Sequence, residues 1–166
     1  MLVLVALAVW PGARPAGAAD GPSTVTCAAC VVMDDTGRVL WARAASTARP
    51  SASTTKMVTA LVVVSTTEPG DVVQVSATAA SVGGGGLDLS PGDVFTVRDL
   101  LHALLVTSSN EAASALAEHV SGSQEAFVDR MNRRAGSLGA SGTHFVNPHG
   151  LDAPGHVSTA KDLARI

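Results

Sequence analysis

Ser53-Thr54-Thr55-Lys56 opens the stretch that decides the fold, and the eight residues after it read Met-Val-Thr-Ala-Leu-Val-Val-Val. That apolar density is typical of a buried helix. If the helix begins near Ser53, residues three apart lie on one face, one turn from each other. The Ser53 hydroxyl would then lie at the positive end of the helix dipole, and a desolvated Lys56 amine within its reach would lose its proton more readily. The pattern predicts a nucleophile and its base, although a capping serine beside a solvated lysine explains these four residues equally simply.

Composition limits the class of protein. The chain has 166 residues, of which 46% are hydrophobic, so it suits one domain with a real core. A net charge of −3, the absence of any Lys/Arg run and only 3% aromatic residues argue against a nucleic-acid partner. No motif for a cofactor is present. The histidines lack the paired spacing of a metal site, so we expect neither a cofactor nor a metal.

The N-terminus has the order of a secretory signal peptide. Residues 1–10 are almost continuously apolar, and the small residues Ala16-Gly17-Ala18-Ala19 follow. We therefore predict a signal peptide over residues 1–19, although no Lys or Arg precedes its apolar run. The run is too short for an ordinary transmembrane helix. Export across the cell membrane is the expectation, with a catalytic domain over residues 20–166.

Cys27 and Cys30 form a C-A-A-C motif that invites a redox or metal interpretation. No second cysteine pair exists to complete a zinc site. Residues three apart on an extended strand lie ~10 Å apart, which is too far for a disulfide without a local turn. We therefore expect two small apolar side chains in a strand.

The order of the expected elements indicates an α+β fold. Runs of β-forming residues at 25–33 and 38–44 flank an Asp-Asp-Thr-Gly turn and predict a hairpin. Two strands do not form a stable sheet alone, so partner strands are expected outside these residues. A short strand is expected at 71–75, and a surface loop at the four glycines 83–86. Further helices are expected from a Thr96–Asp99 capping box to 107, at 111–120, from a Ser123 cap over 124–138, and from 158 onward.

Ser108-Ser109-Asn110 lies at the break between two of these helices. Side chains at such a break can project into a cleft, where a serine relays protons and an Asn amide orients a peptide substrate. An ordinary cap for the second helix is the alternative, since Ser and Asn both cap helices well.

With both motifs in place, the chain resembles the penicillin-binding, serine-type D-Ala-D-Ala carboxypeptidases, relatives of the class A β-lactamases. The likeness extends beyond the two motifs, from about Ala28 to the end of the chain. It includes the approach to the serine at 49–56, the second motif with its flanks at 99–105 and 108–113, and the stretches 127–132, 143–152 and 156–164. The resemblance implies a β-lactamase/DD-peptidase-like fold with an N-terminal sheet hairpin and a helical subdomain.

The resemblance also implies a role for each matching residue. Ser53 would attack the carbonyl of the penultimate D-Ala of a peptidoglycan stem peptide, and Lys56 would accept its proton. Ser108 would pass a proton to the leaving amine, and Asn110 would hold the substrate amide and the Lys56 amine. A β-lactam would acylate Ser53 as a covalent inhibitor. The enzyme would act in the cell wall, on the extracellular or periplasmic side of the membrane, and the sequence leaves a membrane anchor open.

Three departures from the family pattern stand out. Ser109 occupies a position where these carboxypeptidases usually have Gly, and Glu111 replaces a common Asp. The third family motif, K-T-G, is absent from these residues. In the family it lies on a later strand, binds the substrate carboxylate and helps complete the oxyanion hole. We therefore expect a C-terminally truncated catalytic domain that is inactive without that strand.

Two alternatives remain beside the carboxypeptidase. A class A β-lactamase needs a further loop glutamate to activate water, and Glu118 and Glu125 fall in helical runs that do not look like that loop. A non-catalytic cell-wall or β-lactam-binding module is consistent with the missing K-T-G. A Ser–His hydrolase is disfavoured because no G-x-S-x-G elbow is present. Of the five histidines, His102 and His119 fall on helices, whereas His144, His149 and His156 belong to a loop expected to form a structural corner beneath the site.

Overall fold

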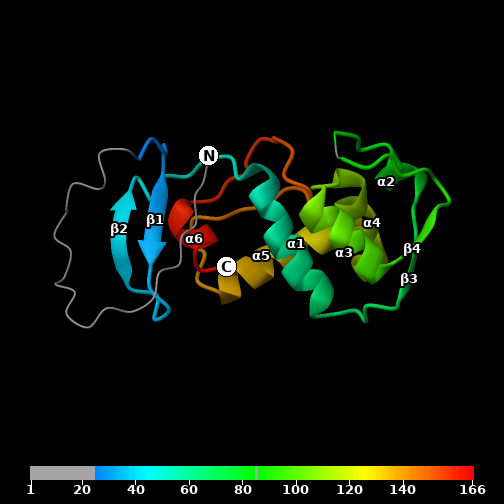
Figure 1. Ribbon diagram of the computed structural model, residues 1–166, viewed down its shortest axis with the longest axis horizontal. Helices are drawn as coiled ribbons and strands as arrows, with labels where there is room; N and C mark the ends of the chain where they lie inside the picture. Colours follow the sequence, from blue (N-terminus) through cyan, green and yellow to red (C-terminus); the bar gives the residue numbers. More distant parts are fainter. Residues whose placement is uncertain (1–24, 85) are drawn as a thin grey trace.

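The computed structural model describes residues 25–84 and 86–166, which form the predicted α+β arrangement. One hairpin lies at one end of the molecule, helices fill the middle, and a second small hairpin lies at the other end (Figure 1). The predicted signal peptide at 1–19 lies outside the described residues. Among the helices of the described part, none is both long enough and apolar enough to cross a membrane.

The N-terminal hairpin pairs strand β1 (Cys30–Met33) with strand β2 (Val39–Arg43) in antiparallel register. Asp34 closes the turn between them, because its carboxylate accepts the backbone N–H groups of Thr36 and Arg38. The hairpin is therefore where the sequence predicts it, although its first strand begins at Cys30 and not at residue 25.

The prediction that Cys27 and Cys30 are two separate apolar side chains of a strand is wrong. Their sulfur atoms form a disulfide, with 6.2 Å between the Cα atoms. Cys27 precedes the strand, and the chain bends at Ala28 and Ala29. This local turn brings the two cysteines within the Cα separation that a disulfide needs, which an extended strand would not do.

Helix α1 (Thr55–Val64) runs through the middle of the molecule, as its apolar sequence predicts (Figure 1). Val58 and Val63 on this helix are fully buried, and each such burial contributes roughly 1.5–3 kcal/mol. Three further helices pack against α1 in one core: α3 (Val97–Val106), α4 (Asn110–Ser121) and α5 (Gln124–Ser137).

Side-chain caps set where these helices begin. The Thr96 hydroxyl accepts the N–H of Asp99, whose carboxylate accepts the N–H of Thr96, so the predicted capping box is confirmed. The Ser123 hydroxyl accepts the N–H of Ala126 at the start of α5, which confirms the second predicted cap. Each cap contributes about 1 kcal/mol.

A second hairpin and a short helix lie at the far end of the molecule. Strand β3 (Val72–Gln74) confirms the expected short strand, and it pairs antiparallel with β4 (Val94–Thr96). Helix α2 (Ala77–Ala80) lies between them in sequence, is capped by Ser76 and packs on α4. The sequence analysis predicted neither β4 nor α2. Both are too short to show a period, and β4 runs directly into the capping box.

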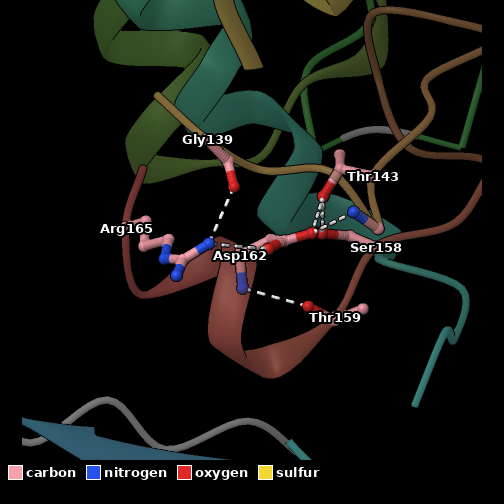
Figure 2. A network of polar contacts seen from close by, with 7 residues as sticks. Gly139, Thr143, Ser158, Thr159, Asp162 and Arg165 are labelled. Carbon is pink, nitrogen blue, oxygen red and sulfur yellow. Dashed lines mark hydrogen bonds and ion pairs between the residues drawn. The ribbon is translucent and has the colours of Figure 1, made fainter. Parts of the chain in front are cut away.

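A buried aspartate anchors the last helix, α6 (Ala160–Leu163), to the loop that follows α5 (Figure 2). One carboxylate oxygen of Asp162 accepts the Thr143 hydroxyl at 3.0 Å. Its other oxygen lies 3.8 Å from the Arg165 guanidinium, which donates to the Gly139 carbonyl at 2.7 Å. These contacts fix α6 in place although the helix has only one turn.

Two isolated backbone bridges connect this anchored segment to the rest of the chain. Ser158 pairs with Arg49, and Val157 pairs with His144, both in antiparallel fashion. Arg49 begins the loop that leads to Ser53. The segment around α6 and the approach to the serine are therefore held as one unit.

Candidate active site

Ser53 lies on a short 3-10 turn, η1 (Ala52–Thr54), which leads directly into α1. We call residues 51–54 the serine turn. Ala52 has a φ of +47°, in the left-handed region that residues with a side chain rarely adopt. Gly150, with a φ of +90°, lies so close behind it that a Cβ atom at position 150 would collide with the Ala52 carbonyl. The serine turn is thus strained backbone that the loop behind it holds in place.

Lys56 lies one helical turn after Ser53, and its side chain is almost completely buried. Its Nζ atom lies 2.7 Å from Asn110 Oδ1, 2.7 Å from the His149 carbonyl and 3.3 Å from Ser53 Oγ. Three acceptors match the three hydrogens of an ammonium group. A neutral amine has two hydrogens, and Asn110 and His149 both present acceptor oxygens to it. Its lone pair is therefore left facing the Ser53 hydroxyl.

The charge state of Lys56 is set by two opposing effects. Burial lowers the pKa of the amine below its ordinary value, because the ammonium form loses its hydration. The negative charge of Glu111, which is buried at the start of α4, raises the pKa and opposes this effect. Burial is the larger of the two. The site therefore makes the ammonium group easier to deprotonate than that of a free lysine, which is what a general base requires.

The loop between α3 and α4 supplies a second hydroxyl. Ser108 has a φ of +60°, and its Oγ donates to Ser53 Oγ across 3.0 Å. Ser109 points the other way: it is fully buried, and its hydroxyl oxygen accepts the N–H of Ala112 as the N-cap of α4. The motif therefore contains both a hydroxyl that faces Ser53, on Ser108, and the cap of α4, on Ser109. Ser109 is accommodated in place of glycine because it faces away from Ser53.

Asn110 is held at both ends of its amide. Its Oδ1 accepts from Lys56, and its Nδ2 donates to the Gly83 carbonyl at 2.9 Å. A Cβ atom at Gly86 would lie 2.7 Å from the Thr107 carbonyl, so the glycine stretch packs directly against this motif. The sequence predicted only a surface loop here, without a role in the site. The run of glycines was itself the signal, because glycine lets two backbones approach closely.

The loop histidines form the expected structural corner beneath the serine turn. His156 Nδ1 accepts the N–H of Val146 at 3.1 Å, so its Nε2 carries the proton and donates to Thr55 Oγ1 at 2.8 Å. The Thr55 hydroxyl in turn lies 2.8 Å from Ser51 Oγ. Burial lowers the pKa of His156, in agreement with a neutral ring.

His149 is held neutral in a similar way. Its Nδ1 accepts the N–H of Leu151 at 3.2 Å. Burial, followed by repulsion from Lys56 and His156 in their protonated forms, lowers the pKa of His149 to about 4. Among the hydrogen bonds of the described residues, none joins a histidine side chain to Ser53, so a histidine base for this serine has no support in the geometry.

On its other side, Ser53 faces a hollow of about 480 Å³. We call this space the substrate-side hollow. It lies between the serine turn, the bend before β1 and the start of α6. Of the described residues that line it, Arg49 alone carries a charge. The lining residues are Ala28, Ala29, Arg49, Pro50, Ser51, Ala52, Ser53, Thr54, Ser158, Thr159, Ala160 and Leu163.

Comparison with known proteins agrees with this geometry. The family model of peptidase S11, D-alanyl-D-alanine carboxypeptidase, matches residues 16–166. The chain belongs to this family. The resemblance to D-Ala-D-Ala carboxypeptidases predicted from the sequence is thereby confirmed, and the β-lactamase alternative is not favoured.

Individual members of the D-alanyl-D-alanine carboxypeptidase family show the same likeness. DacF of Bacillus subtilis is 40% identical over 82% of this chain and 36% of its own length. DacB2 of Mycobacterium tuberculosis is 40% identical over 92% of this chain and 53% of its own length. The crystal structure of DacD from Francisella tularensis superposes with a TM-score of 0.83 at 34% identity, over 92% of this chain and 37% of that one. The chain thus spans about a third to a half of the length of these relatives.

Proposed function

We propose that the chain carries the nucleophile and base of a serine D-Ala-D-Ala carboxypeptidase that trims the terminal D-Ala from peptidoglycan stem peptides. The observation that carries this proposal is the contact of a buried, deprotonation-prone Lys56 with the exposed Ser53 hydroxyl. Activation of a serine by an adjacent base is the general requirement of nucleophilic catalysis. Family membership supports the substrate class.

In the proposed acylation, the Lys56 lone pair accepts the Ser53 proton as Oγ bonds to the carbonyl carbon of the penultimate D-Ala. The resulting oxyanion is stabilised by the backbone N–H of Ser53, at the start of a helix. Ser108, whose Oγ lies 3.0 Å from Ser53 Oγ, passes its proton to the leaving amine as the peptide bond breaks and receives in exchange the proton that Lys56 had accepted. The terminal D-Ala departs and an ester on Ser53 remains. Water then hydrolyses that ester and regenerates the hydroxyl.

Asn110 has two parts in this proposal. Its Oδ1 fixes one hydrogen of the Lys56 amine, which directs the lone pair toward Ser53. Its position beside the reactive pair also lets it hold the amide of the substrate. A β-lactam presents a strained amide to the same serine and would remain attached as a covalent inhibitor. Action on stem peptides requires export, which agrees with the signal peptide predicted at residues 1–19.

The test uses a chimera in which the chain continues after Ile166 with the remainder of DacB2, together with the chain alone. We expect the chimera to release D-Ala from a peptide ending in D-Ala-D-Ala and to hydrolyse penicillin only slowly. Lys161→Met serves as the control for Lys56→Met, since these are the two lysines of the chain. Rapid penicillin hydrolysis without D-Ala release would indicate a β-lactamase. Absence of both activities in the chimera would favour a non-catalytic module.

A further inference from the structure

A second hollow, of about 350 Å³, lies where the end of α1 meets α5, and it shares no lining residue with the substrate-side hollow. Three arginines, Arg130, Arg133 and Arg134, line it from α5. We call this space the arginine hollow. It contains three of the eleven Lys and Arg residues of a chain whose net charge is −3, so positive charge is concentrated there against the overall balance.

These three guanidinium groups have no charged partner within residues 25–84 and 86–166. The ion pairs of that part of the chain involve Arg38 and Arg165 instead. Asp129 lies one turn before Arg133 on α5, but it neither lines the hollow nor pairs with it. The hollow therefore presents donors without an acceptor on the described surface.

Arginines near helix ends often serve to cap the last carbonyls, and here hydroxyl groups already fill that role. Ser65 and Thr66 donate to the Val62 carbonyl at 2.8 Å, at the end of α1. At the end of α5, Ser137 donates to the Arg134 carbonyl at 2.7 Å. The helix dipole still favours positive charge at these ends, but this effect does not account for three guanidinium groups around one hollow.

We infer that the arginine hollow binds a phosphate-type oxyanion. Guanidinium is planar, always charged and presents paired donors that match the oxygens of phosphate. The hydroxyls of the hollow have already given their protons to carbonyls, so the arginines supply the donors. The hollow is shallow and open, and its three arginines lie within five residues of one helix, a spacing that suits a discrete phosphate group contacted by more than one guanidinium. The inference does not depend on the chemistry proposed for Ser53.

The test is calorimetric titration of the whole chain with tripolyphosphate at low ionic strength, where screening is weak. We expect saturable binding that Arg133→Gln weakens by about tenfold, the loss of one charge-assisted contact. Arg98→Gln is the matched control, because it removes one exposed positive charge on α3 outside the hollow. That variant should weaken binding less than twofold. Circular dichroism should show both variants folded, since all the exchanged side chains are exposed.

Two further ligands distinguish recognition of a free phosphate group from attraction by charge alone and from binding to a lipid surface. Citrate carries a similar charge without phosphate geometry and should bind at least tenfold more weakly. Vesicles of phosphatidylglycerol present phosphate at a lipid surface and should not bind in a way that depends on Arg133. The inference is overturned if tripolyphosphate does not bind, if both arginine variants lose affinity equally, if citrate binds as tightly, or if the vesicles alone show Arg133-dependent binding.

Discussion

The two sides of Ser53 are built differently. On the helical side, Lys56 contacts the serine and is itself held by the Asn110 side chain and the His149 carbonyl, and Asn110 is held in turn by the Gly83 carbonyl. On the hairpin side, the serine faces the substrate-side hollow, which small residues line. The proposed function therefore assigns activation of the nucleophile and contact with a substrate to different sides of Ser53. The first is completed between helices α1, α3 and α4, whereas the second face is open.

The largest effect is expected at the centre of the helical side. Lys56→Met removes the amine, leaves the Asn110 and His149 oxygens without their donor, and should slow penicillin acylation of the chimera by about 10²–10⁴-fold. The rate is measured with a fluorescent penicillin. The Lys161→Met control should react at nearly the unmodified rate. Equal slowing in both variants, or none in Lys56→Met, would show that activation does not come from this side.

A backbone change tests whether the helical side also holds the serine turn. Gly150→Ala places a Cβ atom against the Ala52 carbonyl at a φ of +90°, and should lower the free energy of unfolding by about 3–4 kcal/mol. Gly92→Ala is the control, because Gly92 has a φ of +92° and open space around it. It should cost about 1 kcal/mol. Chemical denaturation measures both. Similar losses would mean that the contact with Ala52 is unimportant.

On the other side, Asp162→Asn removes the charge that anchors α6. We expect the free energy of unfolding to fall by about 1–3 kcal/mol, because the Gly142 N–H and the Thr143 hydroxyl lose a charged acceptor. Acylation of the folded chimera should change less than threefold, since Asp162 does not contact the reactive cluster. The exposed Asp129→Asn is the control and should be neutral within ~0.5 kcal/mol. A large loss of acylation at full stability would contradict the separation of the two sides.

The smallest effect concerns the charge balance at Lys56. Acylation should speed up as pH rises, because Lys56 must lose its proton to act as a base. Glu111 raises the pKa of Lys56, so Glu111→Gln should move this rise to lower pH. At a pH below the rise, the variant then reacts faster than the unmodified protein. The exposed Glu125→Gln should leave the profile in place. A shift of the Glu111→Gln profile to higher pH would refute this assignment.

Much of the fold could be predicted because its signals are local. The Asp34 turn, the Thr96–Asp99 capping box and the Ser123 cap each act within four residues, and all three occur as expected. The break between α3 and α4 could be predicted for the same reason, because Ser108, Ser109 and Asn110 are adjacent in sequence. By contrast, β4 and α2 have three and four residues, too few for a periodic signal, and their positions depend on packing against β3 and α4.

The candidate site likewise has a part that local sequence signals predict and a part that they do not. The spacing of Ser53 and Lys56 predicts their contact, since one helical turn joins them. The support for that contact comes from residues far away in sequence, such as Gly83, the His149 carbonyl and Gly150, whose roles depend on backbone approach. A backbone carbonyl or a missing Cβ carries no signature in the residue type. The sequence therefore predicts the side chains that meet at the candidate site, but not the backbone groups that position them.

The most direct test of the central claim is to map the penicillin adduct by mass spectrometry. The chimera is treated with benzylpenicillin, digested and compared with Ser53→Ala and with Ser65→Ala, which alters an α1 hydroxyl away from the site. We predict one adduct on the peptide that contains Ser53, present in Ser65→Ala and absent from Ser53→Ala. An adduct on Ser108, an adduct that persists in Ser53→Ala, or no adduct at all would contradict the assignment of Ser53 as the nucleophile.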